Sequence, residues 1–353
     1  MKLDIIEDNL SRLYKDAYKK QIADEDRIVI ISDLHLGDGG KRDAFLINAD
    51  LVEHVLRDYY LANRFTLVLN GDIEELHRFD LDPVMKRWKH MYTLFNRFAD
   101  SSGLYKIIGN HDYLLHYRKM PELEGHLLHA LRLEYRDNTL FVFHGHQATG
   151  FTEKGNRLAR FVLRYLANPL RIKARTAARN PEKRIRVEKR AYEFSRSRKI
   201  ASIIGHTHRP LFESLSKTDS LKFRIEQLIR EYIRSGEEEK IQMEEKIRFY
   251  RQELARLQQE NRRKEDITGL YDSLILVPSL FNSGCAIKRG GITTLEIEKG
   301  RISLVYWFNR NISQRYMTAE GKKPVQLGDT DYYRTVLKTD RLEYIFSRVK
   351  LLS

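Results

Sequence analysis

The stretch Ser32-Asp33-Leu34-His35-Leu36-Gly37-Asp38 decides how this chain is interpreted. It follows Ile28-Val29-Ile30-Ile31, a β-branched run that is typical of a fully buried strand. Asp33 and His35, separated by one residue at the end of a strand, point to the same side of it. In an open α/β sheet, ligands usually bind at this edge. Alone, an Asp-x-His pair is a weak indication, because an acid can simply orient a structural histidine.

The same arrangement of an apolar run and a ligand-rich turn recurs four more times. The turns are Asn70-Gly71-Asp72 (followed by Glu75), Gly109-Asn110-His111-Asp112, His144-Gly145-His146 and Gly205-His206-Thr207-His208. Carboxylate, carboxamide and imidazole ligands without a thiolate suit Mn, Fe, Zn or Mg better than a structural zinc. The sequence therefore predicts a metal site at the ends of these strands.

In content and order, these turns resemble the motifs D-x-H, GD, GNH-D/E, H and GH-x-H of the calcineurin-like metallophosphoesterase superfamily. The resemblance covers residues 27–210 and the strands around residues 273–308. It implies an α/β fold, a metallophosphoesterase β-sandwich flanked by helices, here with two helical insertions. It also implies two divalent metal ions as cofactors, with manganese favoured over iron, zinc and magnesium.

The resemblance further implies a role for each ligand residue. The predicted ligands divide between two ions and a bridge: Asp33, His35 and His208 for one ion, Asn110, His144 and His206 for the other, and Asp72 for the bridge. His111 would lie over the scissile phosphate, oriented by Asp112, and would protonate the leaving group. The expected reaction is hydrolysis of a phosphate ester or pyrophosphate bond by a hydroxide that bridges the two metals.

Composition adds an expectation about partners. The 353 residues carry a net charge of +14, which implies an anionic partner but says nothing about the fold. The single cysteine, Cys285, excludes an internal disulfide and fits a reducing compartment. The N-terminus lacks a signal-peptide core, and no run approaches the ~20 apolar residues of a membrane span. We expect a cytoplasmic protein, with a peripheral membrane contact through residues 153–199 left open.

Residues 153–199 form the first insertion, and it joins the turn of His144 to that of His206. Sixteen lysines and arginines against four acids give this segment a local net charge of +12. One interpretation is a cap over the substrate; the other is a helical hairpin that packs an apolar stripe on the domain and solvates its charges. The candidate substrate contacts are Arg157, Arg160 and Arg164 in the insertion, with His146, Lys41 and Arg42 outside it.

Residues 217–266 form the second insertion, in which apolar residues repeat at spacings of four and three. A break at Gly236 predicts a coiled-coil-like helical hairpin, which we interpret as an arm for a protein partner or self-association. Three segments remain. Residues 1–26 are an N-terminal region with a helix over residues 4–22, and residues 311–353 are a tail with a helix over residues 331–352. The catalytic core comprises residues 27–152, 200–216 and 267–310.

The substrate is expected to be an amphiphilic or nucleotide-linked anion. The basic insertion resembles the cap of UDP-2,3-diacylglucosamine hydrolases, and Asp72 with Glu75 fits the GD-x-x-E of that group. Those enzymes typically carry arginine where this chain has His111, a departure that favours a broader or different phosphoesterase. The alternatives are a nuclease or broad-specificity phosphatase that binds nucleic acid or phosphoprotein through the insertion. A non-catalytic scaffold is disfavoured, because every ligand position is retained.

Overall fold

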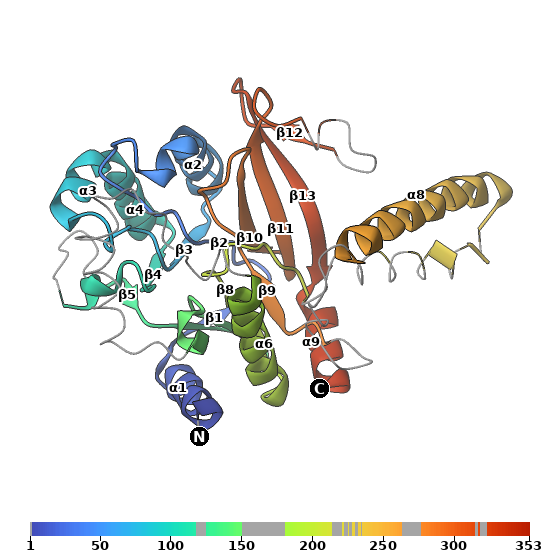
Figure 1. Ribbon diagram of the computed structural model, residues 1–353, viewed down its shortest axis with the longest axis horizontal. Coiled ribbons are helices and arrows are strands. Elements are labelled where there is room, and N and C mark those ends of the chain that lie inside the picture. Colours follow the sequence, from blue (N-terminus) through green and yellow to red (C-terminus); the bar gives the residue numbers. More distant parts are fainter. Residues whose placement is uncertain are drawn as a thin grey trace. The chain divides into compact units, whose positions relative to one another are not determined.

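The structure is a computed structural model of the chain (Figure 1). It describes residues 2–117, 125–149, 181–213, 235–262, 277–314 and 323–353, with a few single positions between these ranges. The chain divides into two compact units, Met1–Glu213 with Val277–Ser353, and Ser214–Leu276. All of the described ligand turns belong to the first unit, which we call the core unit.

The larger sheet of the core unit has eight described strands in the order β12-β13-β11-β10-β2-β3-β4-β5. Their bounds are β2 (Ile28–Ile31), β3 (Thr66–Asn70), β4 (Leu104–Ile107), β5 (Leu127–Leu128), β10 (Ile292–Glu298), β11 (Arg301–Asn309), β12 (Val325–Gln326) and β13 (Tyr332–Arg341). β2, β3 and β4 are parallel neighbours, so their carboxyl ends lie along one edge. All residues of β2 and β3 are buried, as expected of central parallel strands.

The smaller sheet has five described strands in the order β1-β6-β7-β8-β9. Their bounds are β1 (Tyr18–Ile22), β6 (Leu131–Tyr135), β7 (Asn138–Val142), β8 (Ala201–Ile204) and β9 (Leu280–Asn282). β6 and β7 form an antiparallel hairpin, and β7, β8 and β9 run parallel, so the turns of His144 and His206 follow neighbouring strands. The expected α/β fold with two sheets is confirmed.

Helices flank both sheets (Figure 1). Their bounds in the core unit are α1 (Lys2–Asp16), α2 (Ala49–His54), α3 (Leu81–Arg87), α4 (Lys89–Ser101), α6 (Pro181–Ser197) and α9 (Leu342–Leu352), with short turns η1 (Ala44–Ile47), η2 (Val55–Leu61), η3 (Tyr113–His116) and η5 (His146–Thr149). α4 contacts β3 and β4, and buries Met91, Phe95 and Phe98 at helical spacing. α6 contacts β8 and β9.

Two predicted helices are wrong in part, and pairing with distant strands is the reason. The helix expected over residues 4–22 ends at Asp16, because residues 18–22 form β1 and pair with β6, more than a hundred residues away. The helix expected over residues 331–352 begins only at Leu342, because the ten residues before it form β13 along β11. In both segments, a non-local ladder overrides a helical spacing of apolar residues.

The two insertions are described only in part. Residues 150–180 lie outside the described residues, and with them Arg157, Arg160 and Arg164. Val187, Ala191 and Phe194 of α6 are buried, so the last third of the basic insertion packs into the core unit. In the second unit, α8 (Glu237–Arg262) begins just after Gly236, while most of residues 214–234 lie outside the described part, so the hairpin stays a prediction. No helix in the described part of the chain is long and apolar enough to cross a membrane.

Candidate metal centre

Three of the five ligand turns contain residues in an unusual backbone conformation. Five non-glycine residues in them have positive φ angles: Asp33 at 56°, His35 at 54°, Asp72 at 53°, His206 at 60° and His208 at 54°. This left-handed region is unfavourable for residues with a Cβ and persists only where surrounding contacts enforce it. The backbone N–H of Asp33 donates to the carbonyl of Gly71 over 3.0 Å, and that of His35 donates to the carbonyl of Asp72 over 3.0 Å. Neighbouring turns therefore hold one another in this conformation.

Two glycines are required by close approach. A Cβ on Gly109 would collide with the backbone nitrogen and carboxylate of Asp72. A Cβ on Gly71, whose φ is +79°, would collide with the imidazole of His144. These contacts explain Gly71 and Gly109, because the two turns pack backbone against side chain at these positions.

The carboxylate of Asp33 links the two sheets. Its Oδ2 accepts a hydrogen bond of 3.0 Å from the backbone N–H of His206. Its Oδ1 lies 2.9 Å from Nε2 of His208, yet Oδ1 is buried and takes part in no aligned hydrogen bond. Burial alone would raise the pKa of Asp33, but the adjacent His208 outweighs this and lowers it. Oδ2 therefore connects the turns of the two sheets, and Oδ1 is in a position to bind a ligand.

Asp72 divides its oxygens in the same way. Oδ1 accepts a hydrogen bond of 2.8 Å from the backbone N–H of His111. Oδ2 lies 3.1 Å from Nε2 of His144. Nδ1 of His144 lies 2.8 Å from the carbonyl of Asn70 and donates to it, so Nε2 faces Asp72 and carries the lone pair whenever the ring is neutral.

The unpartnered atoms of the site are those that would coordinate a metal ion. Four predicted ligands have a buried atom without any hydrogen-bond partner: Oδ1 of Asp33, Oδ1 of Asn110, Nε2 of His144 and Nε2 of His206. Buried polar atoms are almost always satisfied, so this group of unpartnered atoms is suited to coordinating a metal ion. Among the described residues, the ligand atoms of Asp33, His35 and His208 all lie within 4.8 Å of one another, as do those of Asp72, His144 and His206. The donor set fits divalent metal ions.

Glu75 has a larger part in the site than the sequence suggested. Its Oε1 lies 2.7 Å from Nδ1 of His111, and its Oε2 lies 2.9 Å from Nδ1 of His35. The prediction that Asp112 orients His111 is therefore wrong. Asp112 instead accepts hydrogen bonds from the backbone N–H groups of Gly109 (2.6 Å) and Ile73 (2.8 Å). It shapes the turn, whereas Glu75 orients the ring.

The charges around His111 favour its protonated form. Burial alone would lower the pKa of His111, but the carboxylates of Glu75 and Asp72 outweigh burial and raise it to about 9. For Glu75, burial acts to raise the pKa, and His111 and His35 together bring it well below its ordinary value. In the metal-free protein, His111 and Glu75 therefore form an ion pair.

Sequence reasoning missed a second histidine at this position. His77 is 7% exposed, and its ring centroid lies 4.3 Å from that of His111. Its spacing of two residues from Glu75 was the available signal, since both follow the same strand. His90, by contrast, is exposed.

A contact from the basic insertion reaches the last ligand turn. Glu188 of α6 is 0% exposed, and its Oε1 accepts a hydrogen bond of 2.8 Å from the hydroxyl of Thr207. The guanidinium of Arg209 donates to both oxygens of the same carboxylate. The amide of Asn282 donates to the hydroxyl of Thr207 and to the carbonyl of Gly205, each over 2.9 Å. Thr207 stands between two predicted ligands, so α6 and β9 together position them.

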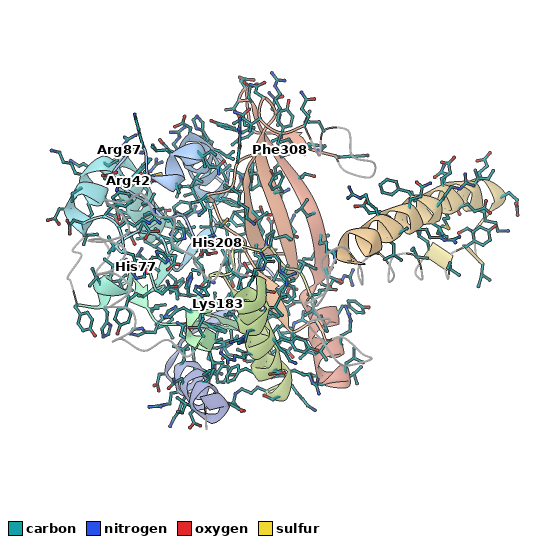
Figure 2. The ribbon with its side chains drawn as sticks, in the orientation of Figure 1. Arg42, His77, Arg87, Lys183, His208 and Phe308 are labelled. Atoms are coloured by element: carbon teal, nitrogen blue, oxygen red, sulfur yellow. The ribbon has the colours of Figure 1, made fainter. Side chains whose placement is uncertain are left out.

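The predicted substrate contacts have different outcomes. Lys41 and Arg42 are exposed in the loop after β2, and Figure 2 shows Arg42 well apart from His208. The ring of His146 lies 5.5 Å from that of His144 and 6.4 Å from that of His206, with Nδ1 buried and unpartnered. His146 is thus at the site, and Lys41 and Arg42 remain predictions.

No family model matches the chain, and no curated protein matches it. Among solved structures, it is similar to a predicted phosphoesterase from Streptococcus pneumoniae TIGR4, at 13% identity and a TM-score of 0.29 over 82% of this chain and 91% of that one. It is also similar to a Vps29 mutant from Entamoeba histolytica, at 11% identity and a TM-score of 0.34 over 80% and 92%. It is similar as well to a cold-active protein-tyrosine phosphatase of a psychrophilic Shewanella species, at 14% identity and a TM-score of 0.34 over 82% of this chain and 80% of that one. Likenesses this weak carry no argument about the activity of the chain.

Proposed function

We propose that the protein is a metal-dependent hydrolase of phosphate esters or anhydrides. One observation carries the proposal: on four separate turns, buried ligand atoms of Asp33, Asn110, His144 and His206 have no hydrogen-bond partner. Such a group of orphans costs free energy unless it serves a ligand. Two divalent ions held there would neutralise phosphoryl oxygens and make water a nucleophile at neutral pH.

The roles of the protein residues follow from the geometry. Glu75 holds Nδ1 of His111, so the proton on Nε2 of that ring is free to pass to a leaving oxygen. Nε2 of His111 lies 4.0 Å from Oδ2 of Asp72, which keeps this proton beside the predicted metal cluster. In Asp33 and in Asp72, one carboxylate oxygen accepts a hydrogen bond from a backbone N–H group, and the other would coordinate the ions.

We further propose that the substrate is a nucleotide-linked or amphiphilic anion. The resemblance of the insertion to the cap of UDP-2,3-diacylglucosamine hydrolases supports this, together with the excess of lysine and arginine over residues 153–199. The described end of that insertion, α6, contacts the His206–His208 turn through Glu188. A basic segment anchored at the metal turn would meet an anionic substrate there.

The test is reconstitution of metal-free protein. After removal of metal with a chelator, Mn, Fe, Zn or Mg is added back, and hydrolysis of bis(4-nitrophenyl) phosphate is measured together with bound metal. Asp72→Asn should lower both activity and metal content, whereas Asp137→Asn, in an exposed hairpin turn, should change neither. Full activity with unchanged metal content in Asp72→Asn would refute the proposal.

A further inference from the structure

The carboxylate of Glu188 accepts three hydrogen bonds from two side chains. Oε1 accepts from Thr207 and, over 3.1 Å, from Nε of Arg209, while Oε2 accepts from the terminal nitrogen of Arg209. Glu188 is fully buried, so these contacts are shielded from water. The bidentate pairing holds Arg209, the residue directly after the predicted ligand His208, against α6.

Arg184 lies one helical turn before Glu188, on the same face of α6. Its side chain is half-buried, and its Nε is buried without a hydrogen-bond partner. Burial lowers the pKa of Arg184; the carboxylate of Glu188 opposes this and the charge of Arg209 adds to it. A buried guanidinium nitrogen without an acceptor is unfavourable, and a bound anion is one of the few explanations for it.

Among the described residues here, positive charge exceeds negative charge. The carboxylate of Glu188 pairs with Arg209, and its charge also acts on Arg184, so two guanidinium groups stand against one carboxylate. Nζ of Lys288 donates to the carbonyl of His208 over 2.5 Å and adds another positive charge to the same turn. Arg209 and Lys288 thus lie at the predicted ligand His208, and Arg184 lies one helical turn from the carboxylate that holds Arg209, an arrangement suited to phosphate oxygens.

We infer that Arg184 and Arg209 form a site for a second anionic group of the substrate, beside the metal-ligand turn. The inference rests on the proposed function and narrows it to substrates with two neighbouring anionic groups, such as a diphosphate. The metal centre would take the phosphoryl group that reacts, and Nε of Arg184 would donate to an oxygen of the other. A substrate with a single phosphorus would leave this site unfilled.

The experiment compares two probes, methylenediphosphonate and inorganic phosphate. Binding of each to metal-loaded protein is measured by calorimetry for wild type, Arg184→Gln, Arg184→Lys and Arg186→Gln. Arg186 is exposed on the same helix and serves as the control. The ratio of the two affinities should fall roughly 10- to 100-fold in Arg184→Gln, the loss expected for a hydrogen bond to a charged group. Arg184→Lys should show a smaller fall, because it keeps the charge and loses the fork. Arg186→Gln should keep the wild-type ratio.

The outcomes separate this inference from the proposed function. If wild type binds neither probe after metal loading, the proposed function fails and the second site fails with it. If wild type binds both and Arg184→Gln leaves their affinity ratio unchanged, only the second site is refuted, and a water molecule is the partner of Nε. Thermal unfolding of each variant identifies a loss that comes from misfolding, and Arg184→Lys then decides the question.

Discussion

Oε1 of Glu75 lies 2.7 Å from Nδ1 of His111, and the other oxygen of this carboxylate lies 2.9 Å from Nδ1 of His35. One side chain therefore orients the predicted proton donor and a predicted metal ligand together. Nε2 of His35 is left facing Nε2 of His208 at 3.3 Å, a distance at which two imidazoles can share an ion. The predicted proton donor and the predicted metal ligand are thus joined through a single carboxylate.

Glu75→Gln should impair both functions at once. A carboxamide offers one acceptor and one donor, so it cannot hold both rings in the same tautomer. Metal affinity and turnover should each fall about 10- to 100-fold, as is typical when a residue that orients a ligand is changed. Titration with Mn²⁺ and steady-state assays would measure the two losses. Glu25→Gln, an exposed change, is the control, and unaltered metal affinity in Glu75→Gln would contradict the shared role.

His111→Ala should bind metal normally and turn over slowly. A leaving-group acid typically contributes ~10²–10⁴-fold, and the alanine variant keeps the backbone N–H that holds Asp72. The loss should be smaller for esters of 4-nitrophenol than for alkyl esters, because a good leaving group needs no proton. Equal losses for both kinds of ester would mean that His111 positions the phosphate and donates no proton.

Glu188→Gln should loosen the His206–His208 turn from a distance. Thr207 and Arg209 would lose a charged acceptor, and metal affinity should fall roughly 10-fold or more. Ser195→Ala is the matched control, because it removes a buried 2.6 Å hydrogen bond between α6 and Ser202 of β8 without touching the turn. A merely structural role of Glu188 would lower the unfolding temperature of both variants and the metal affinity of neither.

Thr207→Ser and Thr207→Val refine that test. Serine keeps the hydroxyl that donates to Glu188, and valine keeps the shape without it. Metal affinity should survive in the serine variant and fall in the valine variant. Equal affinities in the two variants would show that the hydroxyl has no part in positioning the ligands.

Lys106→Met should destabilise the fold strongly. Lys106 is 0% exposed, and its Nζ lies 2.6 Å from Oε2 of Glu74, which is also 0% exposed. Removing one partner of a buried pair typically costs about 3–5 kcal/mol, because the other charge is left uncompensated. Urea unfolding would measure the loss in the free energy of unfolding. The double variant with Glu74→Gln should recover part of it, and a single variant as stable as wild type would contradict the prediction.

The stability of the metal-free protein should fall as pH rises from 7 to 10. Burial acts to lower the pKa of His208 and His144, but Asp33 raises the former to about 10 and Asp72 raises the latter to about 9. A histidine whose pKa is higher in the folded than in the unfolded protein stabilises the folded state. This stabilisation is complete below the unfolded-state pKa of about 6.5 and is lost as pH rises through the folded-state pKa. Burial lowers the pKa of His206 to about 3, so this residue makes the protein more stable as pH rises from about 3 to 6.5 and has no effect on the trend above pH 7.

Added metal should reverse this trend, because metal competes with these protons for the same nitrogens. The rise in unfolding temperature on adding Mn²⁺ should therefore grow from pH 6.5 to pH 9. Differential scanning fluorimetry with and without metal measures it at each pH. A metal effect that is constant over this range would argue that His144 and His208 are not ligands.

The sequence by itself determined the parts that depend on local pattern. Buried β-branched runs such as Ile28–Ile31 predict central strands, and each run is followed by a turn that carries Asp, Asn or His. Because parallel strands end at the same edge, those turns were expected to converge, and the described ligand atoms do lie close together.

Only the tertiary structure decided which partner each group takes. Asp112 stands next to His111 in the chain, yet its oxygens are taken by the N–H groups of Gly109 and Ile73, so Glu75 reaches the ring instead. Residues 18–22 become a strand because β6, far away in the sequence, offers an unpaired edge. Glu188 meets Thr207 because α6 packs on β8. Local periodicity describes one segment at a time, whereas hydrogen-bond partners and edge pairing are settled by competition among segments that only folding brings together.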